Sequence, residues 1–128
     1  MTRVTGIGGI FFKARDAVAL REWYRTHLGI DVQEWGGAAF RWVDAGGQPA
    51  TGTTVWSVSE ASGDYFAPSA SVFMVNYRVA DLHALLRELR KEGCKVLDKT
   101  EESEYGKFGW VLDPEGNKVE LWEPPPGQ

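Results

Sequence analysis

The strongest constraint on the fold of this chain is a repeat within it. In both copies an apolar strand pattern leads into an aspartate, a good helix N-cap, and apolar residues at helical spacing follow. Three further strand-like segments come after each helix. The matching positions are Phe12, Ala14, Asp16, Ala19 and Leu20 in the first copy and Tyr77, Val79, Asp81, Ala84 and Leu85 in the second. The repeat predicts two βαβββ modules, which must pack together because one unit leaves a sheet face bare.

Capping residues, turn residues and hydrophobic alternation give the predicted elements. The first helix begins after Asp16 and ends at Gly29, and the second begins after Asp81 and ends at Gly93. Eight strands are predicted, over residues 4–13, 30–35, 39–44, 52–59, 71–79, 94–99, 106–112 and 117–122. Residues 61–70 are polar and broken by glycine and proline, which is typical of a linker. We therefore expect a single domain over residues 1–128, with a module of residues 1–60 joined by 61–70 to a module of residues 71–124.

The last predicted hairpin carries an isolated carboxylate. Its turn is Asp113–Gly116, in which Pro114 presets the turn conformation and Gly116 supplies the positive φ that follows. In the strand after the turn, Glu120 and Trp122 point to the same face. A charged group among apolar neighbours near the end of a domain requires a partner.

The composition limits the classes of partner. A net charge of −4 argues against nucleic acid, since phosphate binding needs a basic surface. No apolar run approaches a membrane span, and the N-terminus has no signal-peptide pattern. The single cysteine, Cys94, cannot form an internal disulfide, so a reducing cytoplasm is expected. Six tryptophans supply rings for a core and for a ligand pocket.

The segment Asp-Pro-Glu-Gly-Asn-Lys-Val-Glu-Leu-Trp-Glu, residues 113–123, resembles the closing hairpin of the vicinal oxygen chelate superfamily. That superfamily includes glyoxalase I, bleomycin-resistance proteins and extradiol dioxygenases, and the resemblance extends in weaker form along nearly the whole chain. It implies an α+β fold in which two βαβββ modules form a half-open eight-stranded barrel around a cavity. It also implies a homodimer, and Glu120 matches the last of several metal ligands.

The other ligand positions implied by the resemblance hold residues that do not suit a metal. They are Gly9, Thr54 and Met74. Thr54 comes from aligning residues 54–56 with residues 120–122, and a shift of two residues in that alignment puts Trp56 in its place. Glycine has no side chain, and a thioether is a poor ligand for the metals of this superfamily. Both histidines fall on predicted helices, outside the sheets. Since only Glu120 is retained, we expect no metal and no other cofactor.

Strand alternation indicates which residues surround Glu120. Lys13 and Arg78 fall on its face, and together with Glu120 they are the candidate catalytic residues. The candidate ligand-binding residues are Phe11, Trp56, Met74, Asn76, Trp122 and, at the mouth of the cavity, Glu104 and Tyr105. Either a cation keeps Glu120 ionised, or burial raises its pKa and makes it a candidate proton carrier. A static structural ion pair at Glu120 is a third interpretation that stays open.

Three functions fit these residues. The first is metal-independent small-molecule binding or catalysis, with Glu120 as acid, base or ion-pair partner and Lys13 or Arg78 holding an anionic group. The second is a drug- or metabolite-sequestering protein, which resembles the bleomycin-resistance proteins in lacking ligands, in acidity and in aromatic content. The third is a metal-dependent lyase or dioxygenase with ligands elsewhere, which the lack of an interior histidine disfavours. The sequence does not separate the first two.

Overall fold

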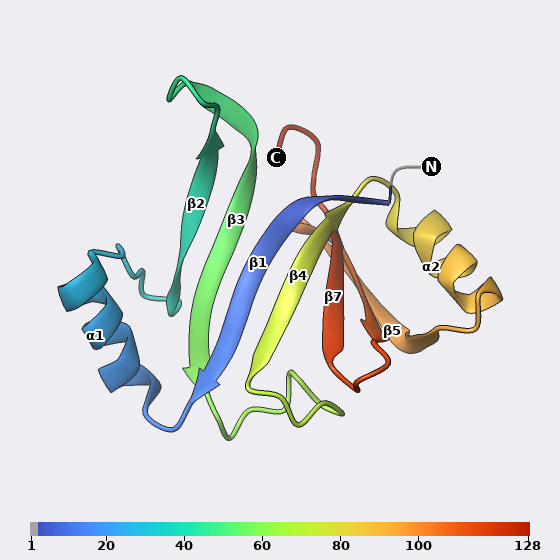
Figure 1. Cartoon of the computed structure of the whole chain (residues 1–128), viewed down its shortest axis with the longest axis horizontal. Coiled ribbons are helices and arrows are strands. Elements are labelled where there is room, and N and C mark those ends of the chain that lie inside the picture. Colours follow the sequence, from blue (N-terminus) through green and yellow to red (C-terminus); the bar gives the residue numbers. More distant parts are fainter. Residues whose placement is uncertain (1–2) are drawn as a thin grey trace.

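A computed structural model describes residues 3–128 as one open, mixed β-sheet with two helices (Figure 1). The strands are β1 (Val4–Ala14), β2 (Gly37–Val43), β3 (Pro49–Glu60), β4 (Phe73–Val79), β5 (Lys95–Ser103), β6 (Gly106–Leu112) and β7 (Lys118–Glu123). The helices are α1 (Ala17–Leu28) and α2 (Leu82–Lys91). The strand order is β2-β3-β1-β4-β7-β6-β5, and the two helices lie toward opposite ends of this sheet (Figure 1). The α+β class is confirmed.

The strand pairing follows the repeat seen in the sequence. In the first half the strand before the helix, β1, pairs in parallel with β3, the last strand of that half. In the second half β4 pairs in parallel with β7 in the same way. The two halves meet where β1 and β4 pair antiparallel. The central strands thus come from both halves, while the linker boundaries and the closure into a half-barrel stay predictions.

The prediction of eight strands is wrong by one, because residues 30–35 form no strand. Their backbone bonds locally: the amide of Gln33 donates to the carbonyl of Gly37, and that of Gly36 donates to Gln33. Arg25 of α1 donates to the carbonyl of Val32 over 3.1 Å. The segment therefore satisfies its polar groups against α1 and a turn, and has no ladder to join. Within residues 3–128 the sheet has seven strands.

The helix boundaries are confirmed by their caps. Oδ1 of Asp16 accepts from the amide of Ala19 over 3.0 Å, and Oδ1 of Asp81 accepts from the amide of Ala84 over 3.1 Å. Gly29 ends α1 in the left-handed conformation with φ of 67°. These bonds satisfy amides at the helix start that have no partner within the helix.

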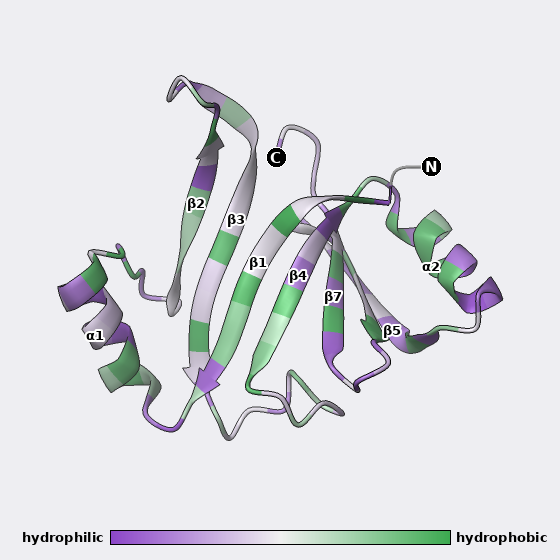
Figure 2. Ribbon diagram, in the orientation of Figure 1, coloured by the Kyte–Doolittle hydropathy of each residue, from purple (hydrophilic) through white to green (hydrophobic). Residues whose placement is uncertain are grey.

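Both helices cover the same face of the sheet. Under α2 lie the buried residues Val79, Leu82, Leu85, Leu86 and Leu121, and under α1 lie Phe12, Ala17 and Val58. Because side chains alternate along a strand, the neighbouring residues on β4 and β7 point to the opposite face. A third cluster of Phe66, Met74 and Trp110 packs on that opposite face. Figure 2 shows hydrophobic residues running along the central strands β1 and β4, while the turns between β1 and α1 and between β6 and β7 are hydrophilic.

The connection between β3 and β4, residues 61–72, brings Phe66 to the sheet face opposite the helices. We call this face of the sheet the Glu120 face. Neither helix in residues 3–128 has the length and apolar character needed to cross a membrane.

Candidate functional site

Glu120 lies at the centre of a hydrogen-bond network on the Glu120 face. Its side chain is 2% exposed. Oε1 accepts from Nδ2 of Asn76 over 2.7 Å, and Oε2 accepts from Nε1 of Trp110 over 2.9 Å and from the hydroxyl of Tyr65. Strand register explains two of these contacts, since Asn76 on β4 and Trp110 on β6 are both paired directly with Glu120. Tyr65 reaches the carboxylate from the 61–72 connection.

All three donors to Glu120 are neutral groups. Burial therefore dominates and raises the pKa of Glu120, while the bonds from Tyr65, Asn76 and Trp110 act against this rise. Burial, together with the charge of Glu120, raises the pKa of Tyr65 far above its usual range, so that the phenol stays protonated as a donor. The charge of Lys118 also lowers the pKa of Glu120, but no ion pair found within residues 3–128 includes this carboxylate.

Lys118 is the cation that acts on this network. Its ammonium group lies 5.2 Å from the ring centroids of both Tyr65 and Trp110 and donates to the carbonyl of Tyr65 over 2.6 Å. Burial lowers the pKa of Lys118, and the charge of Glu120 partly opposes this. Lys118 therefore links the 61–72 connection to β7 through a hydrogen bond. Its charge lies over the rings of Tyr65 and Trp110, the two aromatic residues that bond Glu120.

The structure places Lys13 and Arg78 away from the Glu120 carboxylate. The ammonium of Lys13 lies 5.1 Å from the ring centroid of Phe66. Cζ of Arg78 lies over Trp42 at 4.9 Å and over Trp122 at 5.3 Å. None of the ion pairs found within residues 3–128 involves Glu120. The proposed cationic partners are on the expected face but do not pair with the acid.

Four of the predicted ligand-binding residues do lie on the Glu120 face. Phe11 and Met74 join the apolar cluster beside the carboxylate, and Asn76 bonds it directly. Trp122 lies two residues along β7 and donates from Nε1 to the carbonyl of Tyr105 over 2.8 Å. Met74, Asn76 and Trp122 are buried, as Glu120 itself is.

The prediction that Trp56 lies beside Glu120 is wrong, because Trp56 lies on the face that the helices cover. It packs edge-on against Phe12 and Tyr24 beneath α1, with ring centroids 5.8 and 5.1 Å away. The cause is the register between β1 and β3: Trp56 pairs with Ile10, while its strand neighbour Val55 pairs with Gly9. Trp56 is therefore partly buried beneath α1, on the face opposite Glu120.

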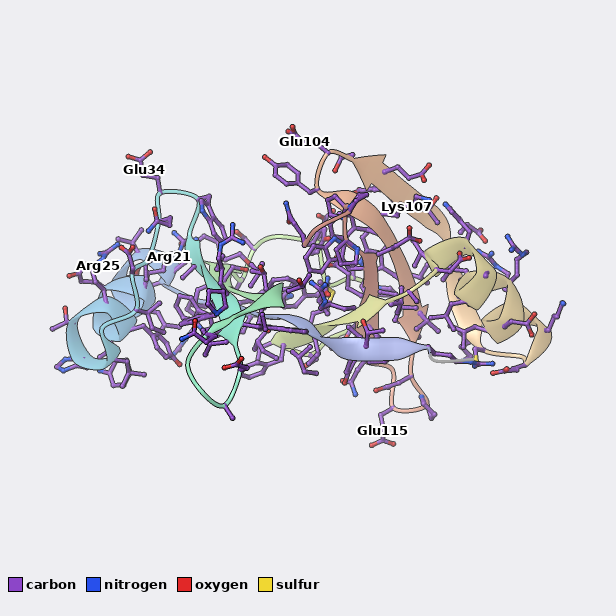
Figure 3. The ribbon with its side chains drawn as sticks, turned by 90° about the horizontal axis from the view of Figure 1, so that it is seen from above. Arg21, Arg25, Glu34, Glu104, Lys107 and Glu115 are labelled. Atoms are coloured by element: carbon purple, nitrogen blue, oxygen red, sulfur yellow. The ribbon has the colours of Figure 1, made fainter. Side chains whose placement is uncertain are left out.

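Glu104 and Tyr105 form the turn between β5 and β6. Glu104 lies at the tip of this hairpin and points outward (Figure 3). Tyr105 is 68% exposed, and its contact with the site runs through its backbone carbonyl, which accepts from Trp122. The structure therefore leaves both side chains outside the Glu120 network, and a role for them in ligand binding stays a prediction.

The residues around Glu120 do not fit the metal that the superfamily implies. Three hydrogen bonds take three of the four lone-pair sites of the carboxylate, two on Oε2 and one on Oε1. At Gly9 the ring of Phe11 fills the space, because an added Cβ would lie 2.5 Å from it. No three His, Cys, Asp or Glu side chains gather as a metal site anywhere in residues 3–128.

Two residues of the network, Tyr65 and Trp110, were missed by the sequence analysis. Trp110 had a usable signal, since the register of the closing hairpin pairs it with Glu120. Tyr65 had none, because it lies in the segment expected to be a linker. An open groove of about 1000 Å³ is a separate feature and lies beside α1, against residues that include Asp16, Trp23 and Tyr24.

Comparison with known proteins agrees with this architecture. The model of the glyoxalase-like domain matches residues 9–122. The chain belongs to the glyoxalase-like domain family. The resemblance to the superfamily is thereby confirmed, and no curated protein matches the chain.

Solved structures similar to this glyoxalase-like chain share its fold over nearly the whole length. Methylmalonyl-CoA epimerase from Mycobacterium tuberculosis is 20% identical, with a TM-score of 0.63, over 98% of this chain and 92% of that one. A methylmalonyl-CoA epimerase in complex with methylmalonyl-CoA and NH4+ is 20% identical, with a TM-score of 0.69, over 98% of both chains. A glyoxalase/bleomycin resistance protein/dioxygenase superfamily member from Vibrio splendidus 12B01 is 13% identical, with a TM-score of 0.58, over 91% and 97%.

Proposed function

We propose that this glyoxalase-like protein binds a small molecule on the Glu120 face and that Glu120 exchanges a proton with it without a metal ion. One observation carries the proposal: a fully buried carboxylate is held by three neutral donors from three different parts of the chain. Burial raises its pKa, which is the direction required of a carboxyl group that acts as a general acid or base at physiological pH.

Tyr65 provides the route by which a ligand reaches the carboxylate. It is 47% exposed and belongs to a connection rather than to the sheet, while Asn76 and Trp110 are anchored on strands. Displacing Tyr65 frees one of the two acceptor positions of Oε2, while Trp110 on Oε2 and Asn76 on Oε1 keep the carboxylate oriented. A proton then moves from a C–H or heteroatom–H of the ligand to Oε2 and returns to the ligand or to water, with no change of oxidation state.

The fold neighbours supply the first probe. One of the methylmalonyl-CoA epimerase structures holds methylmalonyl-CoA, and this compound carries a C–H next to carbonyl groups. We would incubate the protein in D2O with methylmalonyl-CoA, other acyl thioesters and free 2-substituted carboxylic acids, and follow deuterium uptake at that carbon by proton NMR. Glu115→Gln is the matched control, because Glu115 lies in the exposed turn before β7 and points away from the sheet (Figure 3).

The expected result is exchange in the wild type and in Glu115→Gln, and a loss of about 100-fold or more in Glu120→Gln, as is usual when a general base is removed. Equal exchange in the wild type and Glu120→Gln would contradict the role of Glu120.

The second candidate function is sequestration of a drug or metabolite. The observation in its favour is Arg78 between two tryptophans, a binding arrangement that contains no proton carrier at neutral pH. A ligand that binds the wild type without exchange, with equal affinity for Glu120→Gln, would support this function against catalysis.

We also propose that the protein is a homodimer through its first half. The edge strand β2 exposes Phe40 and Val43, which are 48% and 62% accessible, and α1 exposes Leu28. An unpaired strand edge with apolar side chains is commonly covered by association. Multi-angle light scattering should report twice the 14.2 kDa chain mass, and a monomer at micromolar concentration would contradict the proposal.

A further inference from the structure

We propose that Lys118 is a positioning residue, whose ammonium group holds Tyr65 on Glu120 and thereby keeps the 61–72 connection closed over the carboxylate. Lys118 would in this way control the access of a ligand to Glu120, and this consequence rests on the proposed function. The hold on Tyr65 itself rests only on the contacts of these three residues.

Lys118 contacts Tyr65 at two places. Nζ donates to the backbone carbonyl of Tyr65 over 2.6 Å, and it also lies 5.2 Å from the centroid of the phenol ring. The hydroxyl of the same ring donates to Oε2 of Glu120. Lys118 and Glu120 are two residues apart on β7, so their side chains point to the same face of the sheet. One strand therefore presents the cation and the carboxylate together, and Tyr65 bridges them.

The ammonium group of Lys118 is not engaged by a competing carboxylate. None of the ion pairs found within residues 3–128 includes Lys118. The charges of Glu120, Asp64 and Glu101 raise its pKa and that of Lys99 lowers it, while burial, the largest effect, also lowers it. A hydrogen bond from a charged donor is stronger than one from a neutral donor, and only a cation is attracted to the face of the phenol ring. Both contacts with Tyr65 therefore depend on the charge.

The backbone of the connection around Tyr65 bonds mainly to itself. The amide of Ala67 donates to the carbonyl of Asp64 and that of Ser69 to the carbonyl of Phe66, each over 2.9 Å, which are local turns and not a ladder with the sheet. In Figure 1 the connection passes below β4 toward the start of β7, where Lys118 lies. Lys118 is therefore the point at which the last strand bonds the backbone of this segment.

Phe66 and Tyr65 attach the connection in different ways. Phe66 is 2% exposed and packs with Met74 and Trp110, so it is anchored by apolar burial. Tyr65 is 47% exposed and is held by polar contacts with Lys118 and Glu120. Loss of the ammonium group should therefore release Tyr65 while Phe66 stays in place. Segments that open without global unfolding are held by such a small number of contacts.

The test compares four full-length proteins: the wild type, Lys118→Met, Lys118→Arg and the control Lys95→Met. Methionine keeps the apolar stem and removes the charge and the donor, and arginine keeps both. Lys95 is exposed and, like Lys118, is the first residue of a strand. Lys118→Gln is a second neutral variant, for use if Lys118→Met does not give folded protein by thermal unfolding.

Two measurements without any ligand report the opening. In the first, a carbodiimide couples glycine ethyl ester to accessible carboxylates, and mass spectrometry gives the rate at Glu120, with the exposed Glu115 as internal reference. In the second, hydrogen exchange by mass spectrometry follows residues 61–72 and, for comparison, β4.

Lys118→Met should label Glu120 and exchange residues 61–72 about tenfold faster or more, because a charged hydrogen bond is lost. Glu115 and β4 should keep their wild-type rates, and Lys118→Arg and Lys95→Met should behave as the wild type in both measurements. Unchanged rates in the neutral variant, equal acceleration of β4, or no rescue by arginine would each overturn the role of Lys118. Because no ligand takes part, these outcomes are independent of proton exchange, whose persistence in Glu120→Gln would overturn only the role of Glu120.

Discussion

The hydroxyl of Tyr65 donates a hydrogen bond to Oε2 of Glu120, although the two residues lie 55 positions apart in the chain. This bond joins an irregular connection to the last strand of the sheet. Oε2 also accepts from Trp110 on β6, so Tyr65 is the one of the three donors that does not come from a strand. Its bond lowers the pKa of Glu120, against the effect of burial.

The pH dependence of stability should depend on Glu120. Its folded-state pKa is raised above the ordinary value of 4.5, so its contribution to stability is fully present below pH 4.5 and is lost as the pH rises through the folded pKa. The free energy of unfolding of the wild type should fall relative to Glu120→Gln, by up to about 1.4 kcal/mol per pH unit within that window. Urea unfolding of both proteins across the window measures this, and a difference that is constant with pH would contradict it.

Tyr65→Phe should lower the free energy of unfolding by about 1 kcal/mol, because it removes one hydrogen bond and keeps the ring. The same change removes a bond that favours the ionised form, so it should raise the pKa of Glu120 further. Tyr105→Phe is the control, since Tyr105 is 68% exposed and its side chain has no contact with the network. Equal urea midpoints for the two variants would argue against the Tyr65 bond.

Gly8→Ala should destabilise the protein by about 1–3 kcal/mol through overpacking. The added methyl group would lie 2.2 Å from Oδ1 of Asn76 and would force that side chain away from Glu120. The matched control is Gly46→Ala, where the nearest atom to an added Cβ is Oδ1 of Asp44 at 3.4 Å. Thermal unfolding compares the two, and a loss of stability in the control as large as in Gly8→Ala would refute the steric argument.

Zinc, nickel and manganese should leave the melting temperature unchanged. A metal that binds the native state must stabilise it, by about 2.7 kcal/mol when present at 100 times its dissociation constant. Three donors already bond the carboxylate oxygens of Glu120, and no three metal-ligating side chains gather within residues 3–128. Calorimetric titration with the three ions checks this directly. One tight equivalent per chain, lost in Glu120→Gln, would show that the site is a metal centre after all.

Local signals in the sequence predicted the parts of the fold that local interactions determine. Asp16, Asp81 and Gly29 act within one turn of their helices, so their roles could be read from spacing alone. The segment 30–35 has a strand-like composition but no neighbouring strand to pair with. Its strand was predicted wrongly because strand pairing depends on the tertiary structure and not on local composition.

The candidate site was predictable only in part for the same reason. Glu120 was found because its hairpin has a recognisable turn and a resemblance to a family. Trp56 was misplaced because its face depends on the register with β1, which no local pattern encodes. Tyr65 was missed because a long-range hydrogen bond from a connection leaves no trace in hydrophobic periodicity.

The central claim, that Glu120 is a buried proton carrier, is tested most directly by its own titration. The protein would be labelled with carbon-13 at glutamate side-chain carboxyls, the Glu120 signal assigned by its absence in Glu120→Gln, and its chemical shift followed against pH. The account predicts a midpoint above the ordinary value of 4.5, because burial, which favours the neutral acid, outweighs the three hydrogen bonds and the charge of Lys118. A midpoint at or below 4.5 would show that Glu120 is held as a permanent anion, and would contradict its role as a proton carrier.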